Sequence, residues 1–410
     1  MVVHRASRFL FGMPQSGAGT KSLSYHLMLE KGLIHPNAKG LFSILPLGKF
    51  FYMYFFLHET LFIDKLVRLI ENELNMIGAL KMSMPTLGAK ELWTKVDRWQ
   101  KLGSEMFRLV DREGKHFCLQ PTAEEMITQI ITQRGIHRKT MFPFMIYQTT
   151  PKFRDEMNPR FGLLRSREFL MNDLYTFDKC REDALKTYDL ISRVYHRILC
   201  DKLGFNVYVV RADSGNIGGS ISHEYHLPSD SGEDSIAYCE RCREGVNSEL
   251  FRRGEKPCSQ CDELSMKTIS LGRLIAAAID VLSPDNKSLR LPSMIQPFKM
   301  VVIPPSDSSS PHNYPQLSSY AECLVEELDS VPALNNEILL DDRTNYSVGK
   351  RLLLASQLGI SHIVVVGAKS ASLFTYRPLV EYFTVESYQS DPIDMGMISH
   401  EELFEIVQNI

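Results

Sequence analysis

The sequence contains no long hydrophobic run. No apolar stretch among its 410 residues reaches the roughly 18 residues that a membrane-spanning helix needs. The nearest candidate, residues 50–62 (FFYMYFFLHETLF), is shorter and includes His58 and Glu59. The sequence therefore predicts a protein with no membrane partner.

A general excess of positive charge is also missing. The chain has 46 Lys and Arg against 49 Asp and Glu, a net charge of −3. Residues 296–410 are the most acidic part, with 6 basic and 15 acidic residues, whereas the remainder has 40 basic and 34 acidic. This balance excludes nucleic-acid binding through overall charge, so any such surface must be local.

The chain has few cysteines for its length, 8 in 410 residues, which excludes a small disulfide-stapled secreted fold. Four of them nevertheless follow a zinc-ribbon pattern, Cys239-x2-Cys242-x15-Cys258-x2-Cys261, within the stretch 236–265. Two such pairs can supply four thiolates to one tetrahedral zinc ion. The alternative is four reduced thiols without a metal.

Acidic residues are absent from residues 1–29, which contain Arg5, Arg8 and Lys21. A basic, serine-containing and acid-free N-terminus is typical of a mitochondrial transit peptide. We therefore predict a transit peptide over residues 1–23 and localisation in the mitochondrial matrix. The alternative is an N-terminal tail without a targeting role.

Hydrophobic periodicity predicts two domains. Residues 63–80 and 181–204 have helical spacing, and strand-like segments cluster between about 81 and 235, which indicates an α+β domain over residues 24–292. A proline-containing break follows. Strand and helix patterns then alternate over residues 293–410, which predicts a small α/β domain with a mostly parallel sheet.

The most distinctive segment is residues 151–178, PKFRDEMNPRFGLLRSREFLMNDLYTFD. Two strand-like arms flank a turn that contains proline and glycine, and four arginines lie within 14 positions: Arg154, Arg160, Arg165 and Arg167. Guanidinium groups bind phosphate oxygens bidentately, and an aromatic ring among them offers a surface for a purine base. The alternative is a solvated hairpin held by salt bridges.

FRDE followed by a loop and RSREF resembles motif 2 of the class II aminoacyl-tRNA synthetases, in the form found in prolyl-tRNA synthetases. Five further segments resemble this family in the same order. They are the helix 63–80 with its following strand, PTAEE (121–125), GNIGGSISHEYHLPSDSGED (215–234), RLIAAAID (273–280) and LLDDR (339–343) with the residues after it. The resemblance implies an α+β fold, a class II antiparallel-sheet catalytic domain followed by an α/β anticodon-binding domain.

The resemblance also implies residue roles. Catalysis would rest on Arg154, Glu156 and Arg273, and ATP would be bound by Arg154, Glu156, Arg165, Phe169 and Arg273. Thr122, Glu124 and Arg154 would bind proline, whose secondary ammonium needs a carboxylate and a hydroxyl acceptor. The proline carboxylate would attack the α-phosphate of ATP, with Mg²⁺ bridging the phosphates, and the prolyl group would pass to tRNA(Pro). The family resemblance further implies a homodimer, and tRNA contacts by Arg343, Lys350 and Arg351.

The sequence departs from the family pattern at two places. Residues 48–62 have no counterpart, and only 11 residues separate Cys261 from Arg273, where the family has a longer segment that helps to bind ATP and proline. The first hypothesis is an active proline–tRNA ligase of mitochondrial translation. The alternative hypothesis is a catalytically impaired synthetase relative that serves as a nucleic-acid-binding accessory protein.

Overall fold

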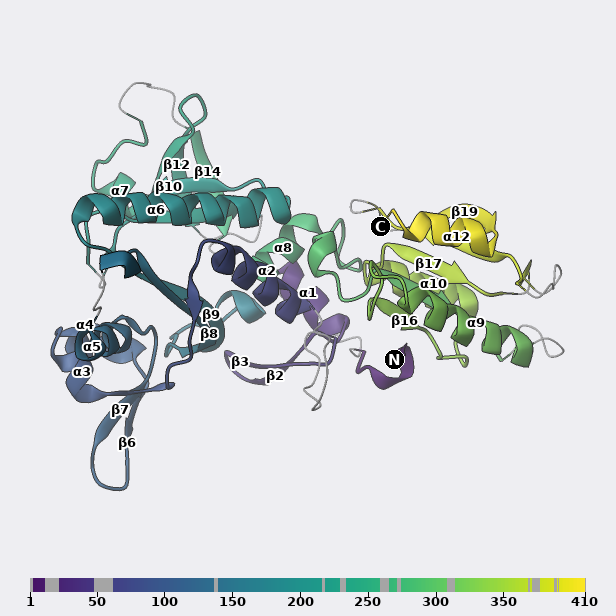
Figure 1. The fold of residues 1–410 in the computed structure, drawn as a ribbon, viewed down its shortest axis with the longest axis horizontal. Helices are drawn as coiled ribbons and strands as arrows, with labels where there is room; N and C mark the ends of the chain where they lie inside the picture. The colour runs from purple at the N-terminus through teal and green to yellow at the C-terminus, as the bar shows by residue number, and fades with distance from the viewer. Residues whose placement is uncertain are drawn as a thin grey trace. The chain divides into compact units, whose positions relative to one another are not determined.

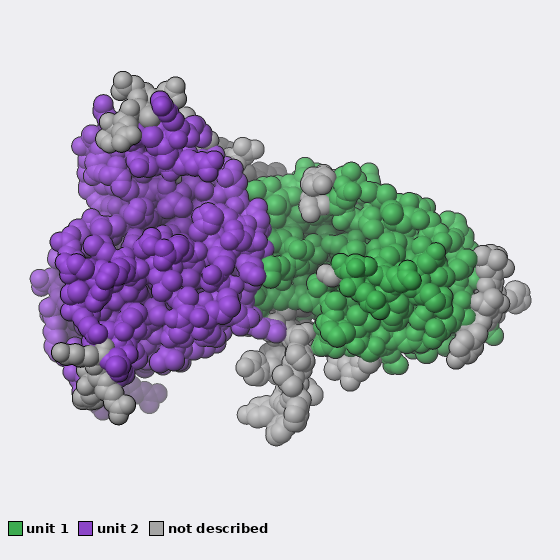
Figure 2. Space-filling view, turned by 45° about the horizontal axis from the view of Figure 1, so that its top comes forward, with its two compact units in different colours: residues 1–35, 44–65, 278–410 green, residues 36–43, 66–277 purple. Residues whose placement is uncertain are grey.

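The computed structural model describes most of the chain: residues 3–11, 22–47, 62–135, 139–215, 218–228, 234–258, 265–270, 274–307, 314–367, 369–370, 377–386, 389 and 391–409. The chain divides into two compact units (Figure 2). Unit 1 comprises residues 1–35, 44–65 and 278–410, and unit 2 comprises residues 36–43 and 66–277. Residues 48–61, Cys261 and Arg273, all singled out in the sequence, lie outside the described residues.

Among the described residues, three sheets lie wholly within unit 2 (Figure 1). The first is β4 (Leu80–Lys81), β8 (Phe144–Phe153) and β9 (Glu168–Phe177), in that order, and the second is β5 (Leu87–Ala89), β7 (His116–Leu119) and β6 (Arg108–Val110). The third closes into a barrel, β10 (Tyr208–Arg211), β11 (His223–Pro228), β14 (Ser265–Ser270), β12 (Asp234–Cys239) and β13 (Glu244–Asn247). Its helices are α3 (Lys90–Thr94), α4 (Arg98–Lys101), α5 (Glu124–Arg134), α6 (Arg181–His196) and α7 (Ser248–Arg252).

The predicted arginine hairpin is present. Strands β8 and β9 pair antiparallel without interruption, from Phe144 opposite Phe177 to Phe153 opposite Glu168. β8 begins with four consecutive apolar residues, Phe144 to Tyr147, and is buried over Met145–Gln148 and again at Lys152. The strand ends at Phe153, so Arg154 begins the turn between the two arms.

The helical predictions are confirmed with shifted ends. The pattern over residues 63–80 forms α2 (Phe62–Met76), and that over residues 181–204 forms α6 followed by a π-helical turn, Arg197–Lys202. Hydrogen bonds fix α6 against β11, because Tyr188 and Ser192 bond to His223 and Tyr225. This packing follows from the amphipathic pattern that predicted the helix.

Five strands from the C-terminal part of unit 1 and one from its N-terminal segment form a six-stranded sheet. Its strand order is β1 (His4–Arg5), β16 (Ile338–Leu340), β15 (Met300–Ile303), β17 (His362–Val365), β18 (Val380–Thr384) and β19 (Ile393–Ile398). The first four strands are mutually parallel, and β18 is antiparallel to both of its neighbours, β17 and β19, which confirms the predicted, mostly parallel sheet. The apolar run that forms β15 is buried on both faces, as is usual in parallel sheets.

Helices cover both faces of this sheet. They are α9 (Tyr314–Asp329), α10 (Val348–Gln357) and α12 (His400–Val407). Leucines of α9 and α12 share one core with β15 to β18, and α10 lies against β15 and β17. Unit 1 also includes α1 (Leu23–Glu30), and the chain further forms β2 (Ile34–Ala38), β3 (Leu41–Ile44) and α8 (Leu274–Leu282). Within the described part of the chain, none of the helices is apolar over a length that would span a bilayer.

The N-terminal segment 3–11 is packed onto this C-terminal sheet. β1 extends the sheet beside β16, Ala6 is fully buried, and the Phe9 ring meets the Phe298 ring edge-on at 5.7 Å. The backbone and hydroxyl of Ser7 donate hydrogen bonds to the Asp342 carboxylate. Cleavage after residue 23 would remove these contacts, so the predicted transit peptide includes residues that take part in the fold; the targeting role itself stays a prediction.

Candidate functional site

The first group of predicted site residues lies at the open end of the β8–β9 hairpin in unit 2. The Arg154 N–H donates to the Arg167 carbonyl at 2.9 Å, which continues the ladder one step past β8. The exposed Arg154 guanidinium lies over the Phe169 ring, 5.5 Å from its centroid. The structure therefore places the guanidinium and the aromatic ring that were predicted to bind ATP next to each other, while their roles stay predictions.

Glu156 and Arg165 form a second pair across the same turn. Arg165 Nε lies 3.0 Å from a Glu156 carboxylate oxygen. Partial burial raises the pKa of Glu156, but hydrogen bonds from Arg165 and from the Asn158 N–H outweigh it, so the net pKa is lowered. Glu156 is thus held as an acceptor-only carboxylate, suited to an exocyclic amino group.

The second group of predicted residues lies at the start of α5. Thr122 is buried, and its hydroxyl has no hydrogen-bond partner among the described residues. An unsatisfied buried hydroxyl is costly unless a ligand or a water molecule supplies a hydrogen bond, so this oxygen can accept one from a substrate. Glu124 opens the helix and borders a cavity of about 700 Å³, which Arg98 and Thr128 also line.

Arg98 is a residue that the sequence analysis missed. Its guanidinium lies 3.1 Å from Glu124 and 2.5 Å from Glu125, and it stacks over the Trp93 ring. Burial raises the pKa of Glu125, although Arg98 opposes this. The sequence did contain a signal for such a residue, the adjacent pair Glu124–Glu125, because two carboxylates that become buried at a helix start need a cation nearby.

Direct backbone and side-chain bonds connect the two groups. The Phe153 N–H donates to the Gln120 carbonyl at 3.1 Å, just before the PTAEE segment. The Ala123 N–H donates to the Tyr175 hydroxyl at 3.1 Å, between the two predicted proline-binding residues. Both groups are therefore fixed to the same β8–β9 sheet. The position of Arg273 relative to them falls outside the described residues.

The three cationic residues predicted to contact tRNA have different environments. Arg343 forms two hydrogen bonds with the Asp341 carboxylate, at 2.8 and 2.6 Å, and stacks over Phe11. Exposed Lys350 lies over the Tyr346 ring. Arg343 and Lys350 therefore remain candidates.

Arg351 requires a correction. Its side chain is fully buried, and its two terminal nitrogens donate to the backbone carbonyls of Asp341 and Pro304 at 2.8 and 2.7 Å. A guanidinium in this position has no access to a tRNA phosphate. The expected tRNA contact is replaced by a structural role, which joins the ends of β15 and β16 to α10.

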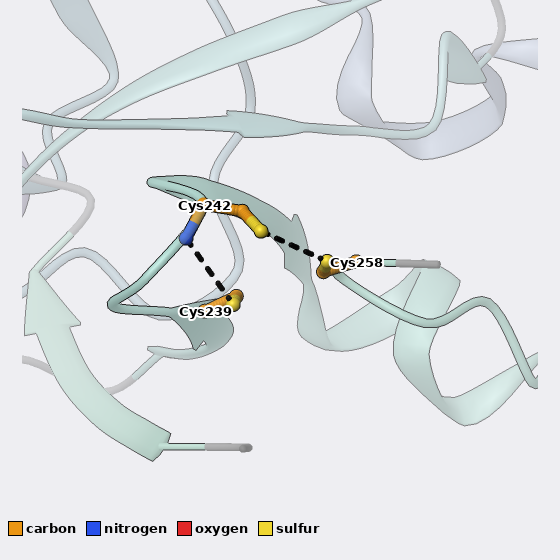
Figure 3. A group of neighbouring side chains, drawn as sticks. All are labelled: Cys239, Cys242 and Cys258. Carbon is orange, nitrogen blue, oxygen red and sulfur yellow. Dashed lines mark hydrogen bonds between the residues drawn. The ribbon is translucent and has the colours of Figure 1, made fainter. Parts of the chain in front are cut away.

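Three of the four predicted zinc ligands lie together (Figure 3). The sulfur atoms of Cys239, Cys242 and Cys258 are all within 4.8 Å of one another, and the last two are 3.3 Å apart. Sulfurs around tetrahedral zinc are about 3.8 Å apart, given Zn–S bonds near 2.3 Å. The Cys242 N–H also points at the Cys239 sulfur, at 3.5 Å.

The turn that carries the first two cysteines is unusual in its backbone. Arg243 adopts a positive φ of 54°, and its N–H donates to the Cys239 carbonyl at 2.8 Å. This tight turn between β12 and β13 brings Cys239 and Cys242 to one side. The three thiols form no disulfide. The fourth predicted ligand, Cys261, lies outside the described residues.

Comparisons with known proteins identify the family of this chain. Residues 107–294 match the family model of the tRNA synthetase class II core domain (G, H, P, S and T). The chain is 36% identical over 386 residues to the probable mitochondrial proline–tRNA ligase of Homo sapiens, covering 85% of this chain and 78% of that protein. It is 33% identical over 408 residues to the corresponding protein of Schizosaccharomyces pombe, covering 89% and 91%.

The fold is also that of solved prolyl-tRNA synthetases. The Giardia lamblia enzyme in complex with prolyl-adenylate superposes with a TM-score of 0.70 at 19% identity, over 95% of this chain and 80% of that one. None of these matches supports the accessory-protein alternative. The extent of the sequence matches shows that this chain belongs to the proline–tRNA ligase family of class II aminoacyl-tRNA synthetases.

Proposed function

We propose that the protein is a proline–tRNA ligase, which activates proline with ATP to prolyl-adenylate and transfers the prolyl group to the 3′ end of tRNA(Pro). The observation that carries this is the joining of two predicted sites on one sheet. The Arg154–Phe169 pair and the Thr122–Glu124 segment are both anchored to β8–β9 by hydrogen bonds at 2.9 to 3.1 Å. A nucleotide site and an amino-acid site must adjoin for adenylate formation.

The chemistry needs positioning and charge stabilisation, without an enzyme nucleophile. In our proposal Arg154 holds the α-phosphate and the proline carboxylate, while Phe169 stacks on adenine and Glu156 accepts from its amino group. Arg165 binds the outer phosphates. The carboxylate oxygen attacks the α-phosphorus, the bond to the bridging oxygen breaks, and pyrophosphate leaves with both electrons of that bond. By the family resemblance, Arg273 would lie on the other side of the nucleotide and reach the γ-phosphate.

Thr122 and Glu124 would receive the proline imino group. The unpartnered Thr122 hydroxyl offers an acceptor, and the Glu124 carboxylate offers a charge for the secondary ammonium. Glu124 already contacts Arg98, so proline would share this carboxylate with the guanidinium. Because Arg98 already contacts this carboxylate, the site favours an amino acid whose ammonium group is compact, such as proline.

Mg²⁺ is part of the proposal as the ion that accompanies ATP and neutralises phosphate charge. The hairpin itself offers arginines to the phosphates. The carboxylates of its turn do not fit the ion, because Glu156 is paired with Arg165 and Asp155 with Arg167. Glu168 points to the other face of β9 from its neighbour Phe169. We therefore derive no catalytic step from Mg²⁺.

The assembly and location are also proposals. We propose a homodimer in the mitochondrial matrix, in line with the two mitochondrial relatives and the predicted transit peptide. We propose that residues 293–410 serve as the anticodon-binding domain, where Arg343 and Lys350 would contact tRNA. This domain has a net negative charge, so contacts with tRNA phosphates would depend on a few local cations such as these two.

We further propose a structural zinc ion bound by Cys239, Cys242, Cys258 and Cys261. The clustered sulfurs support it, and the ion would fasten the β12–β13 turn to the segment that leads into β14. Metal analysis of the purified protein should find about one zinc per chain, and Cys258→Ser should lose it. Cys180→Ser, at an exposed cysteine outside the pattern, is the matched control. Equal zinc content in all three proteins would contradict the site.

Proline-dependent ATP–pyrophosphate exchange tests the ligase proposal. Arg154→Ala should lower exchange by about two to three orders of magnitude, the usual effect of losing one transition-state donor. Arg193→Ala, which removes a guanidinium exposed on α6, should leave it unchanged. Alanine and cysteine replace proline as specificity controls. A folded wild-type protein without exchange would refute the proposal.

A further inference from the structure

A buried polar network lies beneath the Thr122–Glu124 segment, on one face of the β8–β9 sheet. Its members are Gln148 and Lys152 on β8 and Asp173 and Tyr175 on β9. The Gln148 and Lys152 residues are only 1% and 2% exposed, and the Asp173 side chain is 10% exposed. Polar groups buried to this degree need internal partners.

The Asp173 carboxylate is the hub of this network. It accepts hydrogen bonds from Lys152 Nζ at 3.0 Å and from Gln148 Nε2 at 2.9 Å, and the Tyr175 hydroxyl donates to the same oxygen as Gln148. Lys152 also donates to the Thr150 hydroxyl at 2.6 Å. With its charge balanced by a buried ammonium, the carboxylate has a fixed position.

This arrangement dictates what the Tyr175 hydroxyl can do. Because its proton is directed at Asp173, its lone pairs face outward, where one accepts from the Ala123 N–H at 3.1 Å. Burial and the bond to Asp173 raise the pKa of Tyr175, which keeps this proton in place. Ala123 precedes α5, where backbone N–H groups have no partner within the helix.

We propose that Tyr175 is a positioning residue for the amino-acid site. Its hydroxyl, oriented by Asp173 and Lys152, fixes the backbone between Thr122 and Glu124 and so sets where both side chains meet the substrate's imino group. The identity of the substrate in this inference rests on the proposed function. The anchoring of the Thr122–Glu124 segment by Tyr175 does not depend on that function. The nucleotide residues of the β8–β9 turn are held by other bonds, so Tyr175 acts on one substrate only.

The test is Tyr175→Phe, which removes one oxygen atom. The matched control is Tyr147→Phe, a buried tyrosine of β8 whose hydroxyl donates to Asn75 at 2.9 Å and has no bond to the segment. The first readout is the KM for proline and for ATP in pyrophosphate exchange. The second is amide hydrogen exchange of the peptide that spans Ala123, which needs no activity.

We expect Tyr175→Phe to raise the KM for proline about 5- to 10-fold, the loss of one hydrogen bond, with the KM for ATP and the kcat within twofold. The Ala123 peptide should exchange faster by at least the same factor. Tyr147→Phe should change neither. Asp173→Asn, which weakens the acceptor, should shift the proline KM in the same direction.

An unchanged proline KM in Tyr175→Phe, or equal rises in both KM values, would overturn the positioning role. Failure of the proposed function gives a different result, because the wild-type chain would then show no proline-dependent exchange. In that case the hydrogen-exchange arm still decides the anchoring: unchanged exchange at Ala123 in Tyr175→Phe would overturn it.

Discussion

Replacing Arg351 by methionine separates a structural arginine from one that contacts tRNA. Two terminal nitrogens of this buried side chain bond to the carbonyls of Asp341 and Pro304, and methionine fills a similar volume without donating. Hydrogen bonds from charged donors contribute about 1.5–3 kcal/mol each, and a stranded buried carbonyl costs about 1–3 kcal/mol. Methionine offsets part of this because a charge no longer has to be buried.

The balance predicts a loss of about 2–4 kcal/mol in the free energy of unfolding of unit 1. For a domain of 150–250 residues each kcal/mol lowers Tm by about 2–4 °C, so the expected decrease is about 4–16 °C. Differential scanning calorimetry measures it directly. Because the chain has two units, it can unfold in two transitions, and the one that shifts must be assigned to a unit. Urea unfolding of the same variants provides a second measurement for this assignment.

The neighbouring cation provides the control. Lys350→Met removes an exposed charge that lies over Tyr346, and the free energy of unfolding should change by less than about 0.5 kcal/mol. If Lys350 contacts a phosphate, its variant should instead weaken tRNA binding and reduce the salt dependence of that binding. The reasoning fails if Arg351→Met keeps wild-type stability and selectively weakens tRNA binding.

Two further predictions concern unit 1. Phe9→Ala should lower the free energy of unfolding by about 3 kcal/mol, because this buried ring packs on Phe298, and an unchanged urea midpoint would contradict the packing. Burial, aided by Lys299, lowers the pKa of His362 to about 4, and its Nδ1 lies 2.6 Å from the Tyr382 hydroxyl. Since the unfolded chain binds this proton near pH 6.5, the free energy of unfolding should fall by up to about 3 kcal/mol as pH drops from about 6.5 to about 4. His362→Gln should flatten that part of the profile; a wild-type slope would argue against the assignment.

Local periodicity predicted most of the regular elements. The β8–β9 arms, α2, α6 and the alternating strands and helices after residue 293 were each predicted from the apolar residues of the segment itself. Such patterns reflect burial on one face, which is a property of the segment itself. The resemblance then predicted which of their residues belong to a site.

Contacts between distant segments were not predictable in this way. β1 has two residues, too few for any pattern, and it forms only because β16 presents an open edge. The acid-free composition around it matched a targeting peptide equally well. Arg351 follows Lys350 directly, and only the packing of α10 on the sheet buries one and exposes the other.

Position along the hairpin explains why one of its cations is structural while another, two residues later and of the same strand parity, is exposed. Lys152 lies on β8 with its side chain on the buried face, and Arg154 lies just past the end of the strand, where no sheet covers it. Once the register places Gln148 opposite Asp173, Lys152 is four residues further along β8 on the same face, and its long side chain reaches the carboxylate. The network was therefore implicit in the sequence, but it needed the register, which no single strand specifies.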